Sequence, residues 1–349
     1  MKRITLNLIF CCLTMGAFAQ QPLGGFLYGT EAEPKGTEWE APEKLSLNKE
    51  QPRAYFFSFA DVESARRVQP EASSYWQSLN GTWKFHWAPN PDERPKAFYE
   101  TQFDVAAWDD ITVPSCWNVV GIQKDGSLKY GVPIYCNQPV IFKHTKVVGD
   151  WKGGVMREPN KDWTTYKYRN EVGSYRRTFR IPEDWREREV YINFDGVNSF
   201  FYLWINGKYV GFSKNSRNTA SFNISDYLVK GENMVAVEVY RNSDGSFLEA
   251  QDMYRLPGIF RDTYLTSTSK VELRDMKINT DLTAGGASVE VNAMLRNLGA
   301  KAVKGYSLTY SVYQNKLYSD EIVGQVGKPV VSETFVLDKG RQSECINQI

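Results

Sequence analysis

The sequence has almost no surplus of charge of either sign and almost no histidine. Its 349 residues carry 42 Lys+Arg against 41 Asp+Glu, a formal net charge of +1. Nucleic-acid-binding proteins neutralise phosphates with an excess of basic side chains, so this balance argues against a nucleic-acid partner and against a charge-driven role at a membrane surface. With His86 and His144 as the two histidines, a histidine-rich metal site is not expected, and a Ser-His or Cys-His nucleophile has two bases to choose from. Any chemistry is therefore expected to use carboxylates.

Long apolar runs are also absent. No stretch reaches the ~20 apolar residues of a membrane-spanning helix, so we expect no membrane span. The N-terminus comes nearest, because the charged Met1-Lys2-Arg3 precedes an apolar run over residues 4–19 that ends in Ala17-Phe18-Ala19, a pattern that a signal peptidase accepts. We therefore predict a signal peptide over residues 1–19 and export of the chain, either secreted or periplasmic.

Cysteine is scarce as well. Removal of the predicted leader leaves Cys116, Cys136 and Cys345, an odd and sparse set that does not make a disulfide scaffold. A bridge between Cys116 and Cys136 is allowed by the compartment but is not indicated by the spacing. We expect two buried, unpaired thiols there.

The sequence is rich in aromatic residues and in period-two alternation. Its 10 Trp, 20 Tyr and 19 Phe suit either a β-sheet core or a surface that stacks on sugar rings. Residues 82–87 alternate polar and aromatic side chains, as in a strand with one buried face, which predicts that His86 points to solvent. Residues 200–205 are apolar on both faces, as expected for a central strand covered on each side. Asn206-Gly207 directly after them predicts a tight hairpin turn.

Turn signals divide the rest of the chain into three segments. Residues 20–52 are rich in Gly, Pro, Glu and Lys without periodicity and predict an extended lead-in that takes its structure from what it lies against. Many short strands then predict an all-β sandwich of jelly-roll type over residues 53–268, with a helical turn or two around residues 61–67. Residues 269–349 look like an immunoglobulin-type sandwich, a fold of ~100 residues, and residues 340–349 show no strand alternation. We therefore expect this last domain to be incomplete.

A set of short motifs follows in an order that carries a family resemblance. The motifs are Asn80-Gly81-Thr82-Trp83-Lys84-Phe85, Val113-Pro114-Ser115-Cys116-Trp117, Pro133-Ile134-Tyr135, Phe194-Asp195-Gly196-Val197, Gly211-Phe212-Ser213-Lys214-Asn215-Ser216-Arg217, Ser243-Asp244-Gly245-Ser246, Glu249-Ala250-Gln251-Asp252-Met253-Tyr254-Arg255 and Gly258-Ile259-Phe260-Arg261-Asp262. Together they resemble the amino-terminal region of glycoside hydrolase family 2, in its large β-galactosidase type. The resemblance implies a jelly-roll sugar-binding domain followed by an immunoglobulin-like domain.

The same resemblance implies where catalysis takes place. In this family the acid/base and nucleophile glutamates lie on a (β/α)₈ barrel of ~250 residues that follows the immunoglobulin-like domain. No motif in residues 20–349 resembles those that carry them, so we expect no catalytic residue in this chain and no activity of the chain alone. Glu249 and Asp252 are the acids closest to a candidate pair. Retaining hydrolysis needs two carboxyl groups about 5–5.5 Å apart. We expect Glu249 and Asp252 instead to pin a loop through Arg255 and backbone amides, because carboxylates near arginines are usually satisfied ion pairs.

Two asparagines match positions at which the resemblance implies contact with substrate. Asn137 carries an amide that both donates and accepts, as sugar hydroxyls demand, although it could also cap the turn before Pro139. Asn215 stands where the family commonly has an aspartate that touches substrate and helps to hold sodium, and the amide keeps an oxygen but loses the charge. We predict substrate binding by Asn137 and Asn215 and no metal site or cofactor in this chain. Sodium and magnesium are ions that the resemblance allows for the full-length form.

The sequence thus predicts the exported amino-terminal part of a β-galactosidase that hydrolyses terminal β-galactosides in carbohydrate catabolism. Its expected partners are a β-galactoside or glycan and the missing catalytic barrel, and homo-oligomerisation of the full-length form is left open. One alternative is a stand-alone carbohydrate-binding or interaction module. Another is a fragment of a β-mannosidase or β-glucuronidase, which the stretch Asp252-Met253-Tyr254-Arg255 disfavours.

Overall fold

The computed structural model describes residues 25–136, 170–249, 252–284, 286–316, 322–331, 335–337 and 342–348. Strands dominate these residues, and the α-helices among them have four residues each: α1 (Val62–Ala65), α2 (Trp117–Val120) and α3 (Ser246–Glu249). The predicted all-β fold is therefore confirmed. In the described part of the chain, no helix is long and apolar enough to span a membrane.

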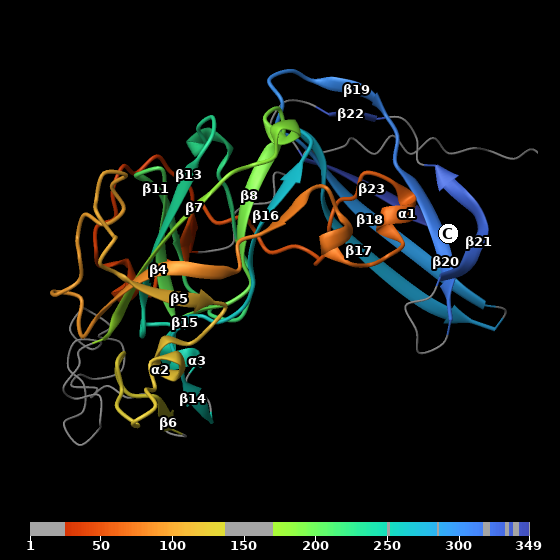
Figure 1. Ribbon diagram of the computed structural model, residues 1–349. Helices are drawn as coiled ribbons and strands as arrows, with labels where there is room; N and C mark the ends of the chain where they lie inside the picture. The colour runs from red at the N-terminus through yellow and green to blue at the C-terminus, as the bar shows by residue number, and fades with distance from the viewer. Residues whose placement is uncertain are drawn as a thin grey trace, which may run out of the picture. The chain divides into compact units, whose positions relative to one another are not determined.

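Two compact units share the described residues, one built mainly from residues 25–269 and the other from residues 270–312 and 325–348. The first unit contains an eight-stranded sheet and a four-stranded sheet (Figure 1). In spatial order the larger sheet consists of β1 (Phe26–Leu27), β2 (Ser46–Leu47), β11 (Lys208–Ser213), β10 (Phe200–Ile205), β13 (Asn233–Tyr240), β7 (Val172–Phe179), β4 (Gly81–Ala88) and β5 (Asp109–Val113). The smaller sheet consists of β12 (Ala220–Asn223), β8 (Glu189–Phe194), β16 (Thr263–Thr268) and β3 (Trp76–Ser78).

Strand β10 shows how the larger sheet is covered on both faces. Phe201 and Leu203 point into a core that also contains Ile192 and Leu265 from the smaller sheet, so the two sheets form a sandwich. The alternating residues of β10, Trp204 among them, belong to a second cluster on the opposite face. All six residues of β10 are buried, which confirms the central strand covered on each side that the sequence predicts.

The lead-in forms one edge of the larger sheet. Strand β2 pairs antiparallel with β11, and β1 pairs parallel with β2. Trp39, between these two strands, is fully buried in the second cluster. Gly211 in β11 leaves room for this arrangement, because a Cβ there would lie 2.1 Å from the carbonyl oxygen of Leu47.

Local signals in the sequence are mostly confirmed. Asn206 and Gly207 both have positive φ, 52° and 79°, as a type I′ hairpin turn requires. Asp61 caps α1 by accepting a hydrogen bond from the backbone N–H of Ser64 at 2.8 Å. Cys116 is a free, half-buried thiol.

The prediction that His86 points to solvent is wrong. Its ring centroid lies 5.3 Å from that of Trp108, and its Nδ1 is buried without a hydrogen-bond partner. Burial lowers the pKa of His86 below its ordinary value. The alternation correctly identified one buried face of β4, but the loop that contributes Trp108 also covers the other face at this point.

The second unit contains a three-stranded antiparallel sheet of β17 (Val271–Thr283), β18 (Gly286–Asn297) and β23 (Gln342–Gln348) and a two-stranded sheet of β19 (Val303–Tyr306) and β22 (Phe335–Leu337). Strands β20 (Thr309–Asn315) and β21 (Ile322–Val331) form a further pair. Residues 342–348 are thus a strand paired with β18, although the sequence shows no strand alternation there. Ladder hydrogen bonds come from the backbone, so an alternating pattern of side chains was not required. The jelly-roll and immunoglobulin-like assignments stay predictions.

Candidate functional site

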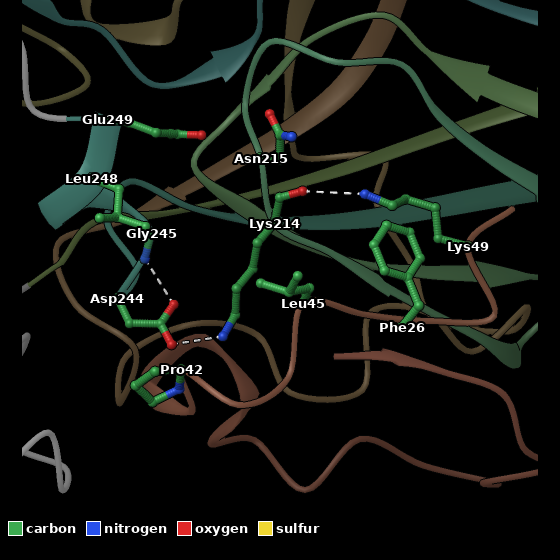
Figure 2. A pocket seen from close by; sticks show the side chains of 10 residues that line it. All are labelled: Phe26, Pro42, Leu45, Lys49, Lys214, Asn215, Asp244, Gly245, Leu248 and Glu249. Carbon is green, nitrogen blue, oxygen red and sulfur yellow. Dashed lines mark hydrogen bonds and ion pairs between the residues drawn. The ribbon is translucent and has the colours of Figure 1, made fainter. Parts of the chain in front are cut away.

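A cavity of about 430 Å³ lies where the lead-in, the end of β11 and the α3 loop come together (Figure 2). Its lining consists of Phe26, Pro42, Leu45, Lys49, Lys214, Asn215, Asp244, Gly245, Leu248 and Glu249. Figure 2 shows Lys49 and Phe26 on one side of the cavity and the residues from 244 to 249 on the other. The lead-in is held here by backbone hydrogen bonds, one of which runs from the N–H of Lys214 to the carbonyl of Leu45 at 3.0 Å.

A buried ion pair forms part of the cavity floor. Lys214 Nζ lies 2.7 Å from Asp244 Oδ2, and their side chains are only 3% and 9% exposed. Lys214 also donates to the carbonyl of Ala41 at 2.7 Å, and Asp244 Oδ1 accepts from the N–H of Gly245 at 2.7 Å. Burial lowers the pKa of Lys214 and raises the pKa of Asp244, while the pairing opposes both shifts. Each charge depends on the other, because an uncompensated buried charge costs about 3–5 kcal/mol.

Asn215, the first of the two predicted sugar contacts, lies at this cavity. It is exposed, although both of its neighbours, Lys214 and Ser216, are buried. Its φ of 77° falls in the left-handed region, which asparagine tolerates better than most residues. The backbone is therefore bent so that an amide, a group able both to donate and to accept, faces the cavity.

Glu249 and Asp252 accept hydrogen bonds from different parts of the chain. Glu249 accepts hydrogen bonds from the N–H of Ser216, at 2.7 Å, and from the Ser216 hydroxyl. Asp252 accepts from the hydroxyl of Tyr135 instead. Both acids thus hold loops in place, and Arg255 donates to the backbone carbonyl of Glu249 at 3.3 Å.

Asn137, the second predicted contact, lies outside the described residues, but the strand that leads to it is described. Strand β6 (Ile134–Cys136) pairs antiparallel with β14 (Met253–Arg255), with Cys136 opposite Met253. Glu249, four residues before Met253, binds the loop of Asn215 through Ser216. The segment from 249 to 255 therefore connects the loop of Asn215 to the strand that precedes Asn137.

A fully buried ion pair anchors the chain next to β6 and at the end of β14. Arg241 lies 2.7 Å from Glu171, and their side chains are 2% and 1% exposed. Arg241 also donates to the carbonyls of Val132, at 2.9 Å, and Arg255, at 3.2 Å, which lie beside β6 and β14. Gly131 permits this packing, because a Cβ there would lie 2.4 Å from a carboxylate oxygen of Glu171. This pair was not predicted from the sequence, because the two residues are 70 positions apart and neither belongs to a motif of the family resemblance.

A sodium ion, which the resemblance allows for the full-length form, does not fit the described residues alone. The two carboxylates that line the cavity with Asn215 already bind Lys214 and Ser216. Across the described residues, no three His, Cys, Asp or Glu side chains come together as metal ligands would. One neutral amide oxygen is far fewer than the several oxygen ligands that hard cations take.

Comparisons with known proteins identify the family. Residues 76–269 match the family model described as "Glycosyl hydrolases family 2, sugar binding domain". The chain belongs to glycoside hydrolase family 2. It is 42% identical over 246 residues to a β-galactosidase of Priestia megaterium and 37% identical over 252 residues to a β-galactosidase of Psychromonas ingrahamii, covering 70% and 72% of this chain. These stretches are 22% of each relative, so the family 2 chain spans about a fifth of the length of the curated relatives it matches.

Solved structures show the same fold for this family 2 chain. A β-glucuronidase of Bacteroides uniformis is similar with a TM-score of 0.58 and 20% identity, over 78% of this chain and 27% of that one. A family 2 member from Bacteroides cellulosilyticus gives a TM-score of 0.53 and 21% identity, over 78% of this chain and 30% of that one. At these identities the likeness shows the all-β fold alone.

Proposed function

We propose that this chain is the sugar-binding part of a β-galactosidase that hydrolyses terminal β-galactosides. Membership of family 2 supports a glycoside as substrate, and the identity of 42% to a β-galactosidase supports the galactoside over other glycosides. The single observation that links the proposal to particular residues is the pair of contacts made by Glu249 and by β14. Glu249 binds the loop of Asn215 through Ser216, and β14 pairs with the strand that precedes Asn137, which supports a shared sugar site for the two asparagines.

The chain by itself is proposed to be inactive. Glu249 and Asp252, the acids that come nearest to a candidate pair, are hydrogen-bonded to Ser216 and Tyr135. Catalysis would then depend on carboxylates of a further domain, which acts as the partner of this one. Purified chain incubated with a chromogenic β-galactoside is expected to release no product, and turnover that co-purifies with the chain would contradict the proposal.

Calorimetric titration with galactose separates this proposal from a stand-alone binding module. A loop that only completes a pocket on another domain leaves most hydroxyls of the sugar in water, so galactose is expected to give no measurable heat. A saturable isotherm that is lost in Asn215→Ala would favour the binding module. Sequencing the gene past the codon for Ile349 is the simplest companion test, since the proposal requires that a catalytic barrel follows.

Export remains part of the proposal. It rests on the charged start and the apolar run that end in Ala17-Phe18-Ala19, which lie outside the described residues. Amino-terminal sequencing of the protein recovered from the periplasm or medium is expected to begin at Gln20. Retention in the cytoplasm with Met1 intact would contradict export.

A further inference from the structure

Lys49 places a positive charge in the cavity without a carboxylate to match it. The residue is 5% exposed and follows β2 in the lead-in. Its Nζ donates to Ser213 Oγ at 3.1 Å and approaches the carbonyl of Lys214 at 3.5 Å, and the ring centroid of Phe26 lies 5.0 Å away. Among the described residues, no acid lies within ion-pair distance of this nitrogen.

Two of the other charged groups of the cavity pair with each other, and the third is hydrogen-bonded to neutral groups. Lys214 has Asp244 at 2.7 Å, and Glu249 accepts from the backbone and hydroxyl of Ser216. Lys49 is therefore the cation of the cavity that has no ion-pair partner among the described residues. Burial lowers the pKa of Lys49 to about 8, so at pH 7 the amine is still largely an ammonium ion.

The walls around this charge are mainly apolar. Phe26, Leu45 and Pro42 contribute from the lead-in, and Leu248, which is 86% exposed, contributes from α3. A volume of about 430 Å³ lies within the range of small-molecule sites, which combine apolar walls with a few polar groups.

We propose that this cavity binds a small organic acid, with its carboxylate on Lys49 Nζ and its apolar body against Leu45, Phe26 and Leu248. Compensation of a buried charge and burial of an apolar body act together, and a charge-assisted hydrogen bond is stronger than a neutral one. The proposal is independent of the galactoside, because Asn215 takes no part in it.

The test is calorimetric titration of the whole chain with 3-phenylpropionate at pH 7, compared with its neutral amide, 3-phenylpropanamide. The acid is expected to bind at one site and at least about tenfold more tightly than the amide, since one hydrogen bond to a charged group is worth that factor or more. Lys49→Met is expected to remove this preference. Lys230→Met, at an exposed lysine outside the cavity, is expected to retain it.

A second variant keeps the test decisive if Lys49→Met changes the fold. Leu45→Trp fills the apolar side of the cavity and keeps the ammonium, so it is expected to abolish binding of the acid. Three results would overturn the proposal: no binding of 3-phenylpropionate up to about 10 mM, equal affinity for acid and amide, or unchanged affinity in a folded Lys49→Met protein.

Discussion

The buried ammonium of Lys49 has a measurable cost, which Lys49→Met should remove. An unfolded chain holds the Lys49 proton up to a pKa near 10.5, whereas burial lowers the folded value to about 8. A difference of this size corresponds to about 3 kcal/mol of lost stability at pH 7. Lys49→Met also loses the hydrogen bond to Ser213, which offsets about 1 kcal/mol of the gain in stability. The variant is therefore expected to be more stable than the wild type by about 2 kcal/mol at pH 7.

The pH dependence gives the sharper form of this prediction. Between the folded and the unfolded pKa, the unfolded state binds more protons, so the stability of the wild type rises with pH. The contribution of Lys49 to this rise is about 2 kcal/mol between pH 7 and 9.5. Lys49→Met lacks it, so the difference in unfolding free energy between the two proteins should shrink by that amount.

Urea unfolding followed by tryptophan fluorescence is the assay. All ten tryptophans lie between residues 39 and 204, so the signal reports on the unit that contains Lys49. Lys230→Met serves as the matched control, because it removes an exposed lysine and should leave the pH profile unchanged. Parallel profiles for Lys49→Met and wild type, or a destabilised variant at pH 7, would refute the argument that the amine is desolvated.

Three further predictions concern packing and titration. Gly211→Ala brings a Cβ within 2.1 Å of the Leu47 carbonyl and is expected to displace β2, with a loss of about 1–3 kcal/mol in urea unfolding and faster proteolysis of the lead-in; an unchanged midpoint would contradict the close approach. Glu171→Gln leaves Arg241 as an uncompensated buried charge, so the free energy of unfolding should fall by about 3–5 kcal/mol in the same assay. A fall of less than about 1 kcal/mol would show that the ion pair does not anchor the chain next to β6 and β14. His86 should titrate below its ordinary pKa in an NMR titration, because burial disfavours its charged form, and its protonation should reduce stability as pH falls through that window; a pKa at or above the ordinary value would contradict the burial.

The sequence predicted those parts of the fold that local pattern determines. Strand β10 is apolar on both faces because both faces are covered, and Asn206-Gly207 turns because both residues adopt positive φ. The prediction that His86 points to solvent was wrong because Trp108, which covers the His86 ring, comes from a loop outside the strand. Strand β23 was missed because its pairing with β18 depends on backbone groups.

The candidate site was predicted only in part. Asn215 could be identified because a family resemblance named its position, and the structure places it at a cavity. Lys49 could not be identified as a site residue from the sequence, because a lysine in a polar lead-in is ordinarily solvated. Its burial comes from contacts with Phe26, close to the start of the lead-in, and with Ser213, 164 positions away. Charge compensation between distant segments leaves no local signal in a single sequence.

The central claim is that this domain serves a β-galactosidase, and relative kcat/KM values test it most directly. The product of the whole reading frame to which this chain belongs would be assayed with matched nitrophenyl β-galactoside, β-glucuronide and β-mannoside. We expect the highest kcat/KM for the galactoside and a raised KM for the galactoside in Asn215→Ala. A preference for the glucuronide or the mannoside, or no hydrolysis of any of the three, would contradict it.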